Sequence, residues 1–163
     1  MNRKRRDGGQ ALVEFALIFP IFMLVLLGIF DIGRAVFAYN TITNSAREGA
    51  RLAIVNQDST SITSRVEGQS PAAAPTTCVV FLKSGRTTSD CATTPAADKC
   101  AAIAVGCVAS VEVRSLFQAI TPIIGNIMGP ATFTARSEVP VEFVCPNLAI
   151  PAWNTAGACP RQP

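Results

Sequence analysis

The chain has 163 residues, of which 49% are hydrophobic and 15% charged, and it contains six cysteines and no histidine. This length allows one or two modest domains and excludes a large enzyme. The hydrophobic excess lies near one end, because 17 of the 20 residues in segment 11–30 are hydrophobic. The net charge of +3 is already reached within residues 1–9, so the remaining chain is neutral and lacks the persistent basic face of a nucleic-acid-binding protein.

The apolar segment is long enough to cross a membrane. At about 1.5 Å per residue, a helix of residues 11–30 spans roughly 30 Å, the thickness of the hydrocarbon core. Fifteen of its residues are apolar types other than alanine, which favour insertion by on the order of 5 to 9 kcal/mol in total. Four basic residues at positions 3–6 precede it, so the positive-inside rule predicts a cytoplasmic N-terminus and a C-terminal part exported across the cytoplasmic (inner) membrane.

The helical pattern continues beyond the apolar segment. Apolar and small residues recur at intervals of three and four as far as Ala53, and no proline follows Pro20 until Pro71. A secretory signal peptide would have a shorter apolar region that ends at a small-residue cleavage site. We therefore predict a single helix from about Ala11 to Val55, bent at Pro20.

One acid interrupts the apolar segment. A carboxylate within a membrane helix costs on the order of 3 kcal/mol, so Glu14 needs an explanation. In a functional interpretation, a protease removes residues 1–9 at the cytoplasmic face, and the Glu14 carboxylate of one subunit then neutralises the new amine of Gln10 in a neighbour. In the alternative, Glu14 lies about one turn inside the membrane, extends to the interface and has no function.

The sequence around this acid resembles a known processing site. The stretch that contains Gly9, Gln10, Glu14 and Phe15 is similar to the N-terminus of type IV pilin-like proteins, in which a glycine precedes the cut and a glutamate stands fifth after it. The glycine is doubled here, and a cut after Gly8 would make Glu14 the sixth residue. The family spacing therefore favours a cut after Gly9.

Two further strings resemble the TadE-like family, the minor pseudopilins of the tight-adherence (Tad/Flp) pilus system. They are Asp-Ile-Gly-Arg at 31–34 and Ala-Arg-Glu-Gly-Ala-Arg at 46–51. The resemblance implies a structural subunit or priming component of a pilus involved in adhesion, trimmed by a prepilin peptidase. It also implies three further partners: the major pilin, other minor pseudopilins and the inner-membrane pilus assembly platform.

One side of the helix after the membrane segment carries small residues, which permit close helix approach. Opposite charges on this stretch are spaced by three, so they can pair along one helix or across two. In one interpretation this side packs against another subunit, and in the other it packs on the protein's own outer domain. The candidate packing residues along the whole helix are Glu14, Pro20, Asp31, Arg34, Ser45, Ala46, Glu48, Gly49, Ala50, Arg51 and Ala53.

The rest of the chain predicts a small strand-rich domain. An apolar run at 78–82 predicts a strand, and alternation at 111–114 and 133–143 predicts two half-buried strands. Pro140 requires the last of these to be an edge strand or to be bulged. Thr121 can cap a short helix that opens with a proline.

Two segments rich in Ser, Thr, Ala and Pro, 58–77 and 84–97, are predicted to be loops. The expected fold class is therefore α+β, with one long helix followed by a small domain. The predicted organisation is a cytoplasmic leader peptide (1–9), a transmembrane helix (10–30), its amphipathic continuation (31–55) and an extracytoplasmic domain (56–163).

The cysteines all lie in this exported part of the chain. An even count without histidine and without a Cys-x-x-Cys pair favours three disulfides over a zinc site. Spacing alone leaves all 15 pairings open. The candidates are Cys78, Cys91, Cys100, Cys107, Cys145 and Cys159.

Catalytic motifs are not found in the sequence. It has no phosphate-binding glycine loop and no nucleophile elbow, and without histidine it lacks the commonest general base. We therefore expect no enzyme, no cofactor and no metal. The alternative to a pseudopilin is an uncleaved membrane protein with one transmembrane helix, whose outer domain binds a surface ligand.

Overall fold

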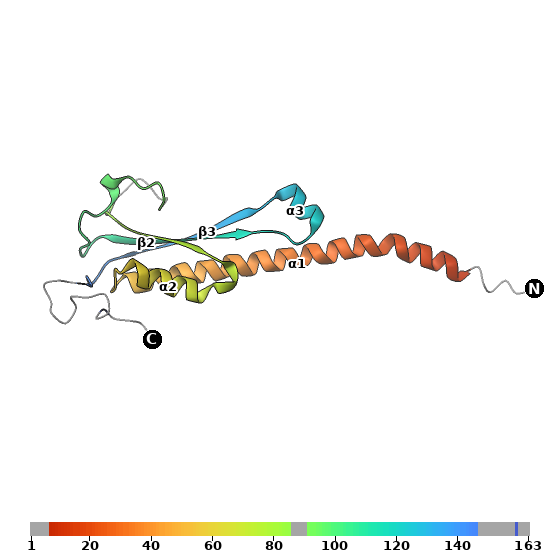
Figure 1. The fold of residues 1–163 in the computed structure, drawn as a ribbon, viewed down its shortest axis with the longest axis horizontal. Helices are drawn as coiled ribbons and strands as arrows, with labels where there is room; N and C mark the ends of the chain where they lie inside the picture. The colour runs from red at the N-terminus through yellow and green to blue at the C-terminus, as the bar shows by residue number, and fades with distance from the viewer. Residues whose placement is uncertain (1–6, 86–90, 147–158, 160–163) are drawn as a thin grey trace, which may run out of the picture. The chain divides into compact units, whose positions relative to one another are not determined.

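The computed structural model describes residues 7–85, 91–146 and 159. The basic residues at positions 3–6 and the Pro-rich stretch around Trp153 lie outside these ranges. The elements confirm the α+β fold class (Figure 1). In chain order they are α1 (Asp7–Ala53), α2 (Ser59–Gln69), the short 3-10 helix η2 (Pro71–Ala73), β1 (Thr76–Leu82), the 3-10 helix η3 (Ala96–Asp98), β2 (Val108–Phe117), α3 (Pro122–Met128) and β3 (Ala131–Pro140).

The long helix α1 contains the predicted helix almost entirely, with Pro20 inside it. It begins four residues before the predicted start and ends two residues before the predicted end. The end is set by the carbonyl of Leu52, which accepts hydrogen bonds from the backbone N–H groups of Val55 (3.1 Å) and Asn56 (2.9 Å). A helix can stop here because its last orphan carbonyls find local partners.

The prediction of a loop over residues 58–77 is wrong, because α2 occupies most of that segment. Asp58 caps the helix by accepting hydrogen bonds from the Ser61 hydroxyl and from the Ser61 backbone N–H, the latter at 2.8 Å. Ile62 and Val66 lie four residues apart and are fully buried. A cap and two apolar residues one turn apart are therefore sufficient for a helix in a segment that is otherwise polar.

The cap residue is charged at neutral pH. The Ser61 hydroxyl, followed by the Ser61 backbone N–H, holds the pKa of Asp58 below its ordinary value of 3.8. A carboxyl whose pKa is lowered by folding stabilises the folded state above its ordinary pKa. The stabilisation of α2 by this cap is therefore complete above pH 3.8 and is lost as the pH falls below that value.

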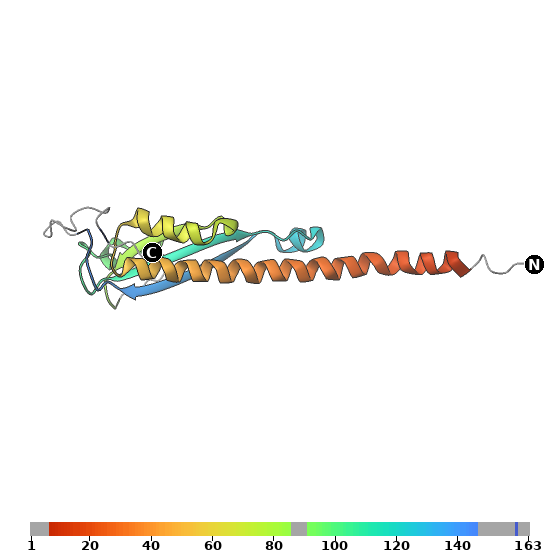
Figure 2. The same cartoon turned by 90° about the horizontal axis from the view of Figure 1, so that it is seen from below.

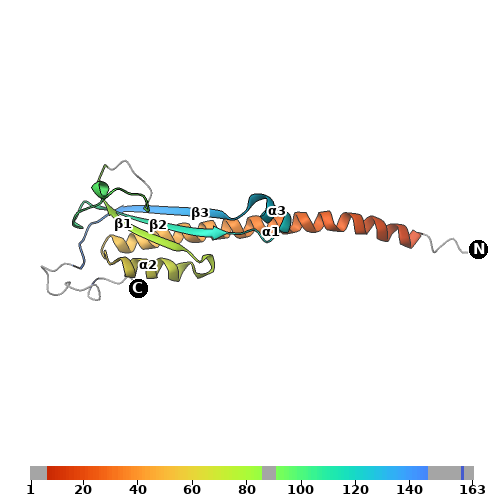
Figure 3. The same cartoon turned by 45° about the horizontal axis from the view of Figure 1, so that its top comes forward.

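The three strands form one sheet in the order β1-β2-β3 (Figure 3). Strands β1 and β2 are antiparallel, with Thr76 opposite Arg114 and Leu82 opposite Val108. All three predicted strands are confirmed, although β3 ends at Pro140 and not at residue 143. The sheet order puts β3 at an edge, where a residue without an N–H is tolerated.

The central strand β2 is not half-buried, as its alternation predicted, but covered on both faces. Its apolar residues Val111 and Val113 are fully buried, and Glu112 between them is only 3% exposed. The second face is covered because Glu112 lies opposite Cys78 in the strand pairing, beside a small cluster of Val80, Leu82 and Cys91. The sequence pattern shows the alternation along β2 but not the residues that cover the second face of this strand.

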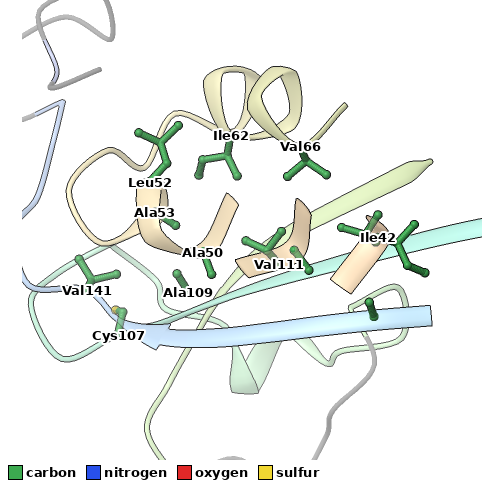
Figure 4. Close-up of a cluster of buried hydrophobic side chains, with 13 residues drawn as sticks. Ile42, Ala50, Leu52, Ala53, Ile62, Val66, Cys107, Ala109, Val111 and Val141 are labelled. Carbon is green, nitrogen blue, oxygen red and sulfur yellow. The ribbon is translucent and has the colours of Figure 1, made fainter. Parts of the chain in front are cut away.

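The main core lies between the C-terminal part of α1, helix α2 and the sheet. Figure 2 shows α2 running beside that part of α1. In Figure 4, Ile62 and Val66 of α2 point toward the α1 segment that carries Ala50, with Val111 of β2 close by. Because the contacting residues of α1 are small, the helix can approach both neighbours closely.

The prediction of three disulfides is confirmed. Cys78 pairs with Cys91, Cys100 with Cys107 and Cys145 with Cys159. Each bond closes a short loop of 7 to 14 residues in sequence separation. Cross-links of this size stabilise a small domain by about 2 to 3 kcal/mol each, through the entropy of the unfolded chain.

Gly49 is the tightest point of the core. A Cβ atom there would lie 2.5 Å from Cγ2 of Val66 and 3.1 Å from Cγ1 of Val111. Gly49→Ala should therefore lower the free energy of unfolding by about 1 to 2 kcal/mol, since overpacking costs more than the gain in helix propensity. Chemical unfolding of the full-length protein in mild detergent, followed by circular dichroism, measures the difference.

Gly68 in α2 provides the matched control, because nothing lies within 4 Å of a Cβ built there. Gly68→Ala should leave stability unchanged or raise it by up to about 1 kcal/mol. A Gly49→Ala protein as stable as the Gly68→Ala protein would contradict the packing described for this helix face.

Candidate membrane and assembly segment

The apolar N-terminal part of α1 is exposed at nearly every residue, and only Met23 and Gly28 are half-buried. Leu12, Leu17 and Ile21 are 69%, 69% and 67% exposed. Among the described residues, α1 is the one helix that is long and apolar enough to cross a membrane, and none of its most apolar stretch is buried by the protein itself. A surface of this kind needs a surrounding apolar medium.

The residues of the predicted processing site lie on the first turns of α1. Gly9, Gln10, Glu14 and Phe15 are all exposed, and Gly8 belongs to the same helix. The side-chain amide Nε2 of Gln10 donates a hydrogen bond to Oε1 of Glu14 at 3.1 Å. The carboxylate therefore lies on the same helix face as residue 10, one turn away from it.

Asp31 is the first residue after the apolar segment, and it is only 5% exposed. Its Oδ1 accepts a hydrogen bond from the backbone N–H of Ile120 at 3.0 Å, and its Oδ2 accepts one from that of Thr121 at 2.8 Å. The guanidinium of Arg34 also lies 3.3 Å from Oδ1, at the spacing that the sequence predicted. The half-exposed Arg34 adds little to this contact, while the two N–H groups bind the charged carboxylate directly.

This contact positions the start of α3. Thr121 occupies the predicted N-cap position, but its side chain makes no capping hydrogen bond. The backbone N–H of Thr121 instead donates to Asp31, which lies 90 residues earlier in the chain. The sequence gives no signal for a contact over this separation.

The small-residue side of α1 packs within the chain. Ser45, Ala46, Gly49, Ala50 and Ala53 are all buried. Two interpretations of this side were left open by the sequence. In the structure it packs on the protein's own strand-rich domain.

The charged pair predicted on the same stretch of α1 is also formed. Glu48 binds Arg51 at 3.1 Å, and Arg65 of α2 lies 3.9 Å from the same carboxylate. Glu48 thus links the two helices at the rim of the core. Because Arg51 is largely exposed, this pair contributes little to stability.

Gln57 and Glu112 are among the buried polar residues that the sequence analysis did not predict. Gln57 follows α1; its side-chain amide donates to the carbonyls of Ala53 (3.0 Å) and Phe143 (2.8 Å) and accepts from the N–H of Cys145 (2.7 Å). Glu112 accepts hydrogen bonds from Nε of Arg114 and from the N–H of Cys91. The strand alternation assigned Glu112 to solvent, and no pattern marks Gln57.

The family model of the TadE-like proteins matches residues 9–51. This N-terminal part of the chain is TadE-like. The match covers 43 of the 163 residues. It contains the predicted processing site from Gly9 onward, the apolar segment and the small-residue side as far as Ala50. No curated protein and no solved structure was found to match the chain.

The match indicates a membrane protein that is associated with the Tad pilus and its components. The exposed apolar part of α1 is consistent with a single pass through the membrane. The family is structural, not catalytic.

The contact between Asp31 and the start of α3 can be tested by hydrogen exchange. Asp31→Ala removes the acceptor of two backbone N–H groups, so the amides of Ile120 and Thr121 should exchange on the order of tenfold faster or more in the full-length protein. Arg34→Gln is the control, because its partly exposed ion pair should change these rates by less than about fivefold. Equal exchange rates in wild-type and Asp31→Ala proteins would show that this contact does not hold α3.

Proposed function

We propose that the chain is a minor pseudopilin, a structural subunit or priming component of a Tad/Flp pilus that serves adhesion. The observation that carries the proposal is the placement of Glu14 and Gln10 on one exposed helix face, at the start of the family match. An exposed carboxylate in an otherwise apolar membrane helix is unfavourable until it meets a positive charge.

Processing would supply that charge. A prepilin peptidase at the cytoplasmic face cuts after Gly9 and leaves Gln10 as the new N-terminus. The amine of Gln10 is then one helical turn from Glu14 of its own chain, and it can instead reach Glu14 of a neighbour when the helices pack side by side. A pairing of this kind fixes the axial register of neighbouring helices, since it is strongest where the two charges are level.

The proposed topology puts residues 1–9 in the cytoplasm, residues 10–30 in the cytoplasmic (inner) membrane and residues 56–163 outside it. The disulfides support the export of the last part, because such bonds form and persist in oxidising compartments. Residues 31–55 contain the rest of α1, as far as Ala53, and carry the small-residue side on which the outer domain packs.

The surface that contacts other pilus subunits is assigned to the exposed part of α1. The small residues of its C-terminal part are already used by the outer domain, which leaves the apolar segment around Glu14 and Pro20 for neighbouring helices. The proposed partners are the prepilin peptidase, the major pilin, other minor pseudopilins and the inner-membrane assembly platform.

The alternative is an uncleaved membrane protein with one transmembrane helix, whose outer domain binds a surface ligand. It shares the topology but needs neither a cut nor the charge of Glu14. Whether the N-terminus is cut therefore distinguishes the pseudopilin from the uncleaved binding protein.

The first test is the N-terminus of the protein extracted from membranes of cells with and without the cognate prepilin peptidase. We expect peptidase-dependent loss of residues 1–9, measured by intact mass and N-terminal sequencing. Gly9→Val should block the cut, and Gly8→Val, the matched control, should leave it in place. An intact N-terminus in both strains would exclude the pseudopilin and favour the anchored binding protein.

Glu14→Gln then separates processing from assembly. It keeps the shape and the hydrogen bonding of the side chain but removes its charge. We expect normal processing with at least tenfold less protein in the sheared pilus fraction, the factor that corresponds to about 1.4 kcal/mol. Unchanged incorporation would show that the carboxylate has no role in register.

A further inference from the structure

Three apolar side chains within residues 118–131, the segment that contains α3, are strongly exposed. Ile120, Ile127 and Met128 are 67%, 79% and 72% exposed. The segment is also uncharged, since it contains no Asp, Glu, Lys or Arg. An exposed apolar segment without charges is suited to a surrounding less polar than water.

The segment has a defined conformation. The N–H of Gly125 donates to the carbonyl of Thr121 at 2.8 Å, and the N–H of Gly129 donates to that of Gly125 at 3.0 Å. Gly129 has a φ of 66°, a left-handed conformation that ends the helix. Ile127 and Met128 are therefore presented by an ordered turn of helix, and Ile120 lies just before it.

Asp31 fixes the position of residues 118–131 along the axis of α1. It accepts the backbone N–H groups of Ile120 and Thr121, and the apolar run of α1 ends one residue before it, at Phe30. If residues 10–30 span the hydrocarbon core, Asp31 lies at the outer boundary of the membrane. The exposed side chains around α3 must then lie at the same boundary.

We propose that residues 118–131 form a second membrane contact, in which α3 inserts into the interfacial layer of the lipid beside the transmembrane helix. The occupant of its apolar surface is the lipid boundary, because the hydrogen bonds to Asp31 hold the segment next to the end of the apolar run of α1. The segment also contains no charge that would have to be desolvated. The inference rests on the membrane crossing of α1 and not on processing or on pilus assembly.

Fluorescence in lipid vesicles tests this contact. The full-length protein carries one tryptophan, so Ile127→Trp is made in a Trp153→Phe background and reconstituted at low protein density in phosphatidylcholine and phosphatidylglycerol. We expect a blue-shifted emission and, because interfacial helices insert to about 5–10 Å, about twofold or stronger quenching by lipid brominated near the top of its acyl chains. Lipid brominated near the chain ends should quench less.

Val105→Trp in the same background is the matched control, since Val105 is equally apolar and 69% exposed but lies outside residues 118–131. Its emission should remain that of an indole in water and should not respond to either lipid. Met128→Trp gives a second site on the proposed contact. The inference is overturned if the indoles at 127 and 128 behave like the control, or if they are shielded from water but not quenched by lipid, because a protein surface would then cover them.

Discussion

The outer domain depends on the close packing of one helix side. Between Ile42 and Ala53, α1 presents small buried residues, and at Gly49 there is no room for a further carbon atom between the helix and its neighbours in α2 and β2. Larger side chains there would separate the layers, and a domain of about 100 residues has little other apolar surface to offset that loss. The same helix also carries the apolar segment. Its N-terminal part therefore needs a surrounding apolar medium, whereas its C-terminal part is buried in the protein's own core.

Buried polar side chains accept hydrogen bonds from backbone N–H groups that have no partner within a helix or strand. Asp31 and Gln57 accept backbone N–H groups from segments far along the chain, at Ile120, Thr121 and Cys145. Glu112 does the same for Cys91 beside a disulfide. The bound N–H groups all belong to residues outside the helices and strands, and a side-chain acceptor there prevents the cost of a buried unpaired N–H.

Much of this fold follows from the sequence because its strongest signals are local. The apolar run, the helical periodicity beyond it, the three strands and the even number of cysteines are each visible within a short stretch. The same holds for the stretch that resembles the TadE-like family. Helix α2 was missed because its composition is typical of a loop. Its two buried residues form part of the core only because they pack against α1, and the local sequence does not show that contact. The second covered face of β2 and the contacts of Asp31 and Gln57 depend on residues that are up to 90 positions apart, and no local pattern contains them.

In the proposed topology, α1 crosses the membrane with the disulfide-bonded domain outside. This topology is tested most directly by protease protection of a full-length protein with a different epitope tag at each end, produced without the prepilin peptidase so that the N-terminal tag is retained. In spheroplasts, proteinase K should remove the C-terminal tag and leave the N-terminal tag intact, and in inverted membrane vesicles the pattern should reverse. Loss of the N-terminal tag from intact spheroplasts, or protection of the C-terminal tag there, would contradict the account.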